Sequence, residues 1–119
     1  MDNTILLKSK NFAVRIIKCY KYLNDQKHEH ILSKQLIRCG TSIGANAIES
    51  RNAQSRSDFT SKLNIALKEA DETAYWLDLL HSSDYLDDNL FNSLSNDCQE
   101  LISILISIIK SLKNSKTEN

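Results

Sequence analysis

The feature that most constrains this chain is a series of apolar and small residues whose spacing alternates between four and three positions. Alternating steps of four and three keep every member on one face of an α-helix and are typical of helices that pack nearly parallel. A half-buried strand would instead alternate at every second residue. The series predicts a long helix over about 58–82. Its members are Phe59, Leu63, Ala66, Ala70, Thr73, Leu77 and Leu80.

Three other segments carry similar series and predict helices over about 9–24, 29–52 and 88–113. The chain has 119 residues, no proline and only two glycines, so it lacks the turn residues that a sheet of this length needs. We expect residues 1–8 to be a frayed lead-in and residues 114–119 to be a disordered tail. The fold class is therefore all-α: a single domain over 1–119, built as an antiparallel up-down-up-down four-helix bundle.

Both glycines of the chain, Gly40 and Gly44, fall inside the second predicted helix. Each costs ~1 kcal/mol relative to alanine in a helix interior. The apolar residues before and after the two glycines nevertheless fall on the same helix face, which favours a continuous helix. Their four-residue separation places them on one face, where they would let a neighbouring helix approach closely. A break near Gly40 is the alternative.

A polar stripe runs along the same helix and faces acids on the next one. If the two helices are antiparallel and joined near residue 55, Arg38 lies opposite about residue 72, which predicts an ion pair with Glu69 or Glu72. We interpret the stripe as a partly buried network that fixes helix register. A contact surface for a partner and a catalytic acid–base pair of Glu49 with Glu69 or Glu72 are the alternatives. The predicted network comprises Arg38, Ser42, Asn46, Glu49, Glu69 and Glu72.

Charge is distributed unevenly although the formal net charge is zero. Residues 1–62 carry 11 Lys/Arg and 5 Asp/Glu, whereas residues 63–119 carry 4 and 10. The opposed halves could attract each other within the bundle. Alternatively, the basic residues could form a stripe that binds nucleic acid or another partner. The candidate contacts are Lys10, Arg15, Lys18 and Lys21 of the first helix, with Arg51 and Arg56 as additions.

The fourth predicted helix is apolar over more than the single stripe that a monomeric bundle needs. The third helix also has aromatic and aliphatic residues away from its core series. Singly exposed apolar residues are normal, but together these side chains predict a subunit interface, where aromatics are enriched. The predicted interface comprises Ile65, Tyr75, Trp76, Leu79, Ile102, Ile106 and Ile109.

The motifs of common chemistries are absent from the sequence: no HExxH, ExxH, CxxC, GxSxG or P-loop pattern occurs. We therefore expect no catalytic residue, metal, cofactor or small-molecule substrate. Three widely separated cysteines predict buried thiols in a reducing compartment. The first residues lack a signal-peptide pattern, and no apolar stretch of 18 residues occurs. These features predict a cytoplasmic protein that does not enter a membrane.

Residues 38–76 carry a family resemblance, and the likeness extends over about residues 10–112. The matching residues are Arg38, Ser42-Ile43, Asn46, Ile48-Glu49, Ser57-x-Phe59, Ile65-Ala66 and Glu69-x-x-Glu72-Thr73. This pattern resembles the bacterial four-helix-bundle proteins encoded within intervening sequences of 23S ribosomal RNA (S23-like proteins). It is also similar to the accessory variability proteins of diversity-generating retroelements. The chain departs from the family at Ser50, where glycine is usual, and from the strongly basic retroelement proteins in its neutral charge.

The resemblance implies a homo-oligomer, in the form of a ring-like homopentamer of bundles packed side by side, without enzymatic activity. The retroelement branch implies binding to a reverse transcriptase and its template RNA. We therefore expect a non-catalytic oligomeric interaction module that binds RNA or an RNA-handling protein such as a reverse transcriptase. A purely structural homo-oligomer without nucleic-acid binding is the alternative.

Overall fold

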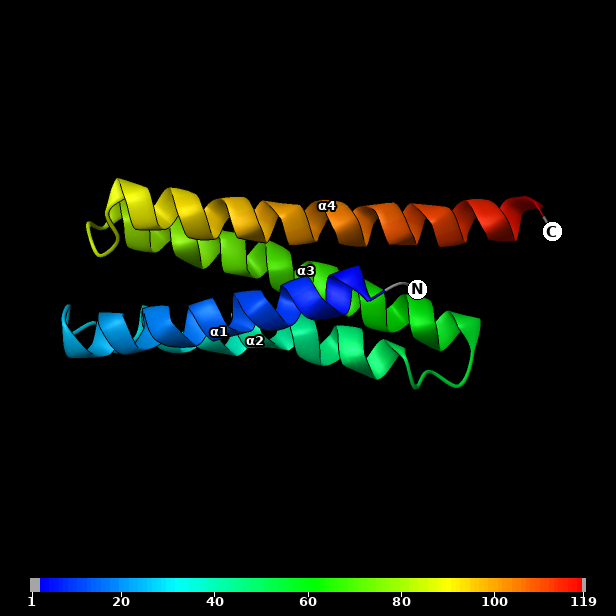
Figure 1. Ribbon diagram of the computed structural model, residues 1–119, viewed down its shortest axis with the longest axis horizontal. Coiled ribbons are helices and arrows are strands. Elements are labelled where there is room, and N and C mark those ends of the chain that lie inside the picture. Colours follow the sequence, from blue (N-terminus) through cyan, green and yellow to red (C-terminus); the bar gives the residue numbers. More distant parts are fainter. Residues whose placement is uncertain (1–2, 119) are drawn as a thin grey trace.

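The computed structural model describes residues 3–118, with side chains through residue 114. It contains four helices: α1 (Thr4–Asp25), α2 (Leu32–Ser50), α3 (Arg56–Ser82) and α4 (Asp88–Glu118). Figure 1 shows that each helix runs back along the one before it, so that α1 and α3 point the same way. The bundle measures 53 × 22 × 20 Å. The prediction of an all-α four-helix bundle is confirmed.

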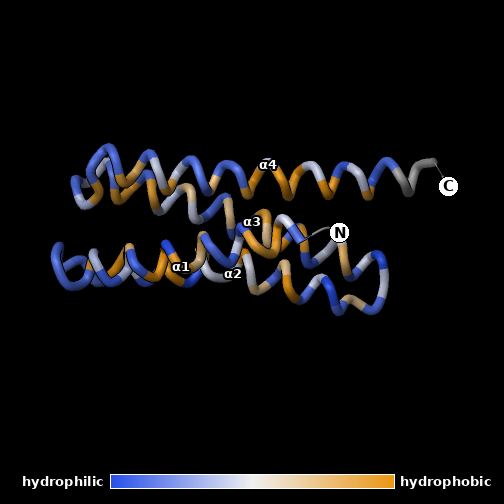
Figure 2. The backbone as a smooth tube through the Cα atoms, in the orientation of Figure 1, coloured by the Kyte–Doolittle hydropathy of each residue, from blue (hydrophilic) through white to orange (hydrophobic). Residues whose placement is uncertain are grey.

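The helices pack in the cyclic order α1, α2, α3, α4, because α1 contacts α2 and α4, and α3 contacts the same two helices. Helices α1 and α3 therefore lie diagonally across the bundle, and their outward faces point in different directions. The predicted series form the core: Ile16, Leu36, Leu77 and Leu105 are fully buried. Apolar positions alternate with polar ones along every helix in Figure 2, as expected for helices with one buried stripe.

The first and the last helix both extend beyond their predicted bounds. Helix α1 begins at Thr4 rather than at residue 9, because Ile5 continues the buried series and is fully buried. The expectation of a frayed lead-in was therefore wrong for residues 4–8. Helix α4 continues to Glu118 rather than ending at 113, so the disordered tail expected from 114 was also wrong as far as residue 118. Residue 119 lies outside the described residues.

Capping explains where α2 begins. The Glu29 carboxylate accepts hydrogen bonds from the backbone amides of Ile31, Leu32 and Ser33, at 3.2, 3.0 and 2.7 Å. These amides have no partner inside the helix, so the carboxylate completes the first turn from outside it. The helix consequently begins at Leu32, three residues after the predicted start, and it ends at Ser50 instead of 52.

Side chains also cap the two later helices. The Ser55 hydroxyl accepts from the Asp58 amide at 3.0 Å, so Ser55 is the cap of α3. The Asp87 carboxylate accepts from the Leu90 amide at 2.8 Å. That contact satisfies one of the free amides in the first turn of α4.

Helix α2 runs unbroken through both glycines, as predicted. A methyl group at Gly40 would lie 2.9 Å from Ile16 Cγ2, and one at Gly44 would lie 3.2 Å from Ser9 Oγ. Both neighbours belong to α1. The two glycines therefore allow α1 to approach the backbone of α2 more closely than a side chain would permit.

Candidate functional site

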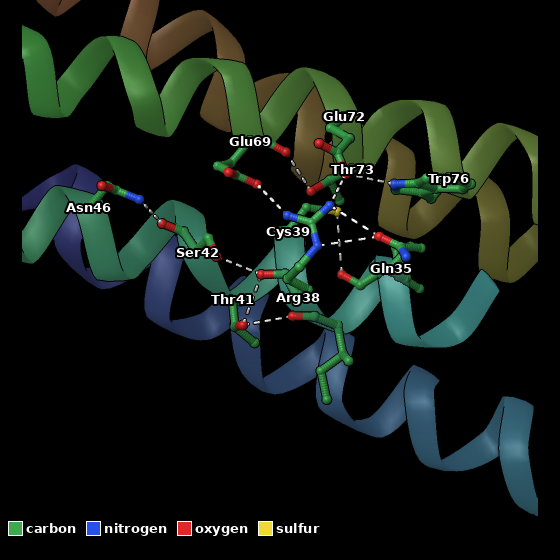
Figure 3. A network of polar contacts seen from close by, with 12 residues as sticks. Gln35, Arg38, Cys39, Thr41, Ser42, Asn46, Glu69, Glu72, Thr73 and Trp76 are labelled. Atoms are coloured by element: carbon green, nitrogen blue, oxygen red, sulfur yellow. Dashed lines mark hydrogen bonds and ion pairs between the residues drawn. The ribbon is translucent and has the colours of Figure 1, made fainter. Parts of the chain in front are cut away.

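A polar network joins α2 to α3 around the guanidinium of Arg38 (Figure 3). Arg38 forms ion pairs with Glu69, at 3.5 Å, and with Glu72. It also donates a hydrogen bond to Gln35 Oε1 at 3.2 Å. From the other side, Trp76 Nε1 donates to Glu72 Oε2 at 2.9 Å. The antiparallel packing of α2 and α3 thus brings Arg38 next to both Glu69 and Glu72, the two alternative partners predicted from the sequence.

The two carboxylates in this network have different environments. The indole hydrogen bond from Trp76 and the nearby Arg38 charge together outweigh desolvation and hold the pKa of Glu72 below its usual value. Glu69 Oε2 is buried and has no hydrogen-bond partner among the described residues, although it lies within ion-pair distance of Arg38. The Arg38 guanidinium therefore offsets the negative charges of both Glu69 and Glu72. Its removal would leave both without a cation.

Ser42 and Asn46 join this network only through the backbone of α2 (Figure 3). Ser42 Oγ donates to the Arg38 carbonyl at 2.6 Å, and Asn46 Nδ2 donates to the Ser42 carbonyl at 2.8 Å, so both bonds stay within α2. Short polar side chains in a helix commonly reach the carbonyl four residues earlier. Glu49 forms a separate ion pair with Lys62 of α3, at 3.2 Å. Of the six residues predicted to form the network, Glu49 is therefore the one that lies outside it among the described contacts.

The six basic candidates divide into two groups. Arg15 pairs with Asp97 of α4 at 2.6 Å, and Arg56 Nη2 donates to the Leu112 carbonyl at 2.8 Å. Both arginines therefore connect helices within the bundle. The other four are exposed and have no side-chain partner in the part of the chain that the structure describes. They are Lys10, Lys18, Lys21 and Arg51.

The opposed charges of the two halves do meet within the bundle. Lys8 of α1 pairs with Glu100 of α4 at 3.0 Å, next to the Arg15–Asp97 pair on the same two helices. Exposed pairs of this kind are worth about 0.2–1 kcal/mol each. Attraction between the halves, one of the two interpretations of the charge pattern, therefore has a structural basis at the α1–α4 contact.

The predicted interface residues occupy the outer surface of α3 and α4. Tyr75 is 55% exposed, Ile65 39% and Ile106 37%. Ile65 and Ile109 also line a groove of about 880 Å³ between the two helices. The remaining members are half-buried at the edge of the core: Trp76, Leu79, Ile102 and Ile109.

Sequence reasoning missed a second apolar surface, on α1. Leu7 is 60% exposed, Val14 43% and Ile17 38%. Leu7 falls in the segment expected to be a frayed lead-in, and the predicted interface included no residue of this helix. With Lys10 and Lys21 these residues form a series spaced by three and four, on the side of α1 away from the core. The same spacing rule that found the core could have found this outward series.

The described residues also bear on metal binding, thiol reactivity and membrane insertion. No group of three or more His, Cys, Asp or Glu side chains lies close enough together to hold a metal ion. The three cysteines are free and buried, and burial raises the pKa of Cys19 to about 11 and that of Cys98 to about 12. Within the same part of the chain, every helix is too short or too polar to cross a bilayer.

These features define a class: an all-α, four-helix-bundle protein with a polar α2–α3 network and several large apolar side chains exposed at its surface. The chain belongs to the 23S rRNA-intervening sequence protein family, whose model matches residues 1–107. A solved structure from Bacteroides thetaiotaomicron, described as a protein with unknown function from the S23 ribosomal protein family, is 52% identical. The likeness covers 90% of this chain and 99% of that one, with a TM-score of 0.89. A comparison with curated proteins finds no match.

Proposed function

We propose that this protein is a self-assembling interaction module whose described surface serves contact rather than catalysis. The observation that carries the proposal is the exposure of large apolar side chains on two different faces, at Leu7 and Val14 of α1 and at Ile65 and Tyr75 of α3. Apolar side chains gathered on a surface are typical of protein–protein contacts. The family resemblance adds the expectation of a homopentamer in the cytoplasm.

Sedimentation velocity of paired variants tests this proposal. Tyr75→Lys places a charge on the α3 surface and is expected to shift the protein to smaller species at equal concentration. Ile48→Lys is the matched control, because Ile48 is a comparably exposed apolar residue, at 47%, on α2. Equal sedimentation of wild type and Tyr75→Lys would argue against assembly through α3.

RNA binding through α1 is a second candidate, and the unpartnered lysines favour it. Lys10, Lys18 and Lys21 lie on the outer side of one helix and have no acidic partner among the described residues, so their charges are available to phosphates. Binding to an RNA-handling protein such as a reverse transcriptase is proposed from the family resemblance alone. Filter binding of a structured RNA at two salt concentrations tests this candidate.

The expected result is an affinity that falls with salt and that Lys18→Glu weakens more than Lys34→Glu. Lys34 is an exposed lysine of α2 and serves as the control. Each lost phosphate contact lowers the salt slope by about one. An affinity that does not change with salt would contradict RNA binding by these lysines.

A further inference from the structure

The groove of about 880 Å³ between α3 and α4 lies at the end of the bundle where α3 begins. Arg56 Nη2 donates to the Leu112 carbonyl at 2.8 Å, which holds the first turn of α3 beside α4. The groove residues of α3 run from Arg56 to Lys68, a distance of about 18 Å along the helix axis. The floor is aliphatic and is formed by Ile65, Ile109 and Leu112. The groove therefore has the length of about three helical turns.

Every charged side chain that lines the groove in the described structure is basic. Arg56 and Lys113 lie at one end, and Lys68 lies at the other. Residues 101–117 of α4 contain no Asp or Glu. On the facing stretch of α3, Asp58 is the one acid, and it does not line the groove. A ligand in this groove would therefore meet positive charge at both ends.

Acidic residues begin on α3 where the groove ends. Asp71 and Glu72 follow Lys68 by about one turn and do not line the groove. The positive charge of Lys68 acts on Glu72, but no ion pair joins Lys68 to either acid among the described residues. On α4, Glu100 pairs with Lys8 of α1 instead. Lys68 is therefore an exposed cation at the border between the basic groove and an acidic surface.

Small polar side chains form the α3 wall of the groove: Ser57, Thr60, Ser61 and Asn64. Thr60 and Asn64 donate to backbone carbonyls within α3. The Ser57 and Ser61 hydroxyls have no hydrogen-bond partner among the described residues. An alkyl chain along this wall would cover these hydroxyls without replacing their bonds to water, which costs free energy. A protein helix carries polar side chains that can bond to them.

The lining also distinguishes a helix from a nucleic acid. It contains no aromatic side chain on which a base could stack, and a phosphate backbone would leave the aliphatic floor without a contact. An amphipathic helix in a groove instead packs its apolar face on the floor and places charged residues along the rims. Aliphatic floor, polar wall and basic ends together fit this last kind of ligand.

We propose that the groove binds an acidic amphipathic helix of another protein, about three turns long. Its apolar face covers Ile65 and Ile109, and carboxylates near its two ends reach Lys68 at one end of the groove and Arg56 at the other. Ile65 and Ile109 are then contacts for this partner rather than for a second subunit. The proposal goes beyond self-assembly, whose test at Tyr75 lies about 15 Å further along α3 than Ile65.

Fluorescence anisotropy with a designed peptide tests the site. The probe is a labelled helical peptide about four turns long, with leucines along one face and glutamates on both flanks. The matched probe carries lysines in place of the glutamates. The glutamate peptide is expected to bind with an affinity that falls with salt, and the lysine peptide is expected to bind about tenfold more weakly or less.

Charge reversal at one end of the groove provides the first variant. Lys68→Glu is expected to weaken the glutamate peptide about fivefold and to strengthen the lysine peptide. Lys34→Glu is the control, because it changes the net charge equally at an exposed lysine of α2. Circular dichroism verifies that both variants keep their helices. Equal effects of the two variants would show that the peptide responds only to net charge and would overturn the proposal.

Truncation of the floor provides the second variant. Ile65→Ala removes part of the aliphatic surface and is expected to weaken the glutamate peptide about fivefold. Ile48→Ala is the control on α2, because Ile48 is 47% exposed and Ile65 is 39% exposed. Isoleucine methyl spectra then locate the bound peptide: the Ile65 and Ile109 signals are expected to shift, and those of Ile17 and Ile48 to stay. The reverse pattern would place the peptide outside the groove and contradict the proposal.

Other occupants give different results. Dodecanoate or a structured RNA that binds wild type, loses affinity in Lys68→Glu and is not replaced by the glutamate peptide would assign the groove to that ligand and overturn the proposal. A lower mass of Lys68→Glu by light scattering, with Lys34→Glu unchanged, would make the groove a subunit contact and would also overturn it.

The peptide and the mass separate the two proposals of partner binding and self-assembly. A monomeric wild type that binds the glutamate peptide in the groove would refute self-assembly and support the partner site. An assembled wild type that does not bind the peptide would refute the partner site and leave self-assembly standing.

Discussion

The two glycines of α2 provide a sharp test of the close approach to α1. Replacing glycine by alanine in a helix interior gains about 1 kcal/mol of helix propensity. At Gly40 the new methyl would lie 2.9 Å from Ile16 Cγ2 and 3.0 Å from Cγ1, two carbons of a fully buried side chain. At Gly44 the nearest atom is the Ser9 hydroxyl, at 3.2 Å. The two substitutions therefore have the same propensity gain but different steric costs.

The contact distances set the expected magnitudes. Inserting a methyl into a packed core costs about 1–3 kcal/mol, so Gly40→Ala is expected to lower the free energy of unfolding by about 0–2 kcal/mol. The Ser9 hydroxyl can move by the few tenths of an ångström that Gly44→Ala requires, since its bond to the Leu6 carbonyl is long, at 3.3 Å. We therefore expect Gly44→Ala to be neutral or to stabilise by up to about 1 kcal/mol.

Urea unfolding followed by circular dichroism measures both variants, at one fixed protein concentration because assembly would add to apparent stability. Adding Ile16→Ala supplies a double-mutant cycle: removal of the Ile16 side chain opens space for the new methyl at Gly40. The two changes together should cost less than their sum, by about 1–2 kcal/mol. Equal stabilisation by Gly40→Ala and Gly44→Ala, with no coupling to Ile16, would refute the close approach.

Three further predictions concern the polar and buried groups. Arg38→Met is expected to destabilise the fold by about 1–3 kcal/mol in thermal unfolding, because it leaves two acids without their cation; a change within error would contradict this role. The pKa of Glu29 is lowered, because hydrogen bonds from three backbone amides outweigh desolvation, and the pKa of Glu72 is lowered as well. A carboxyl with a lowered folded-state pKa stabilises the fold above its unfolded pKa, and this contribution disappears as the pH falls through the folded value. Glu29→Gln should therefore flatten the loss of stability below about pH 5, and an unchanged acid profile would argue against the cap. The raised pKa values of Cys19 and Cys98 predict slow labelling by a thiol reagent at pH 8, with rates that follow unfolding; immediate labelling would contradict their burial.

The sequence predicted most of the fold because helix spacing reports burial directly. The apolar series predicted four helices and the continuity of α2, and their antiparallel order predicted an ion pair of Arg38 with Glu69 or Glu72, both of which the structure contains. Helix ends were less predictable, since they depend on individual contacts. Glu29 caps α2 from three residues before its first residue, and α1 extends to include Ile5, which is fully buried.

The outer surface was harder to predict than the core, because one helix can carry two apolar series. Val14 and Ile17 lie within two positions of the buried Ile16, and only the packing of α1 shows which series is buried. The basic residues had a similar ambiguity. Arg15 looks like its neighbouring lysines in the sequence, but its partner on α4 is 82 positions away. Charge composition alone therefore could not separate residues that hold the bundle together from residues that remain free.

The mass of the wild-type protein in solution tests the central claim most directly. Light scattering coupled to size exclusion, over a range of concentrations, gives this mass without assumptions about shape. Self-assembly predicts a multiple of the 13.6 kDa chain, and the ring expected from the family resemblance predicts about five times that value. A mass of 13.6 kDa at every concentration would contradict the account.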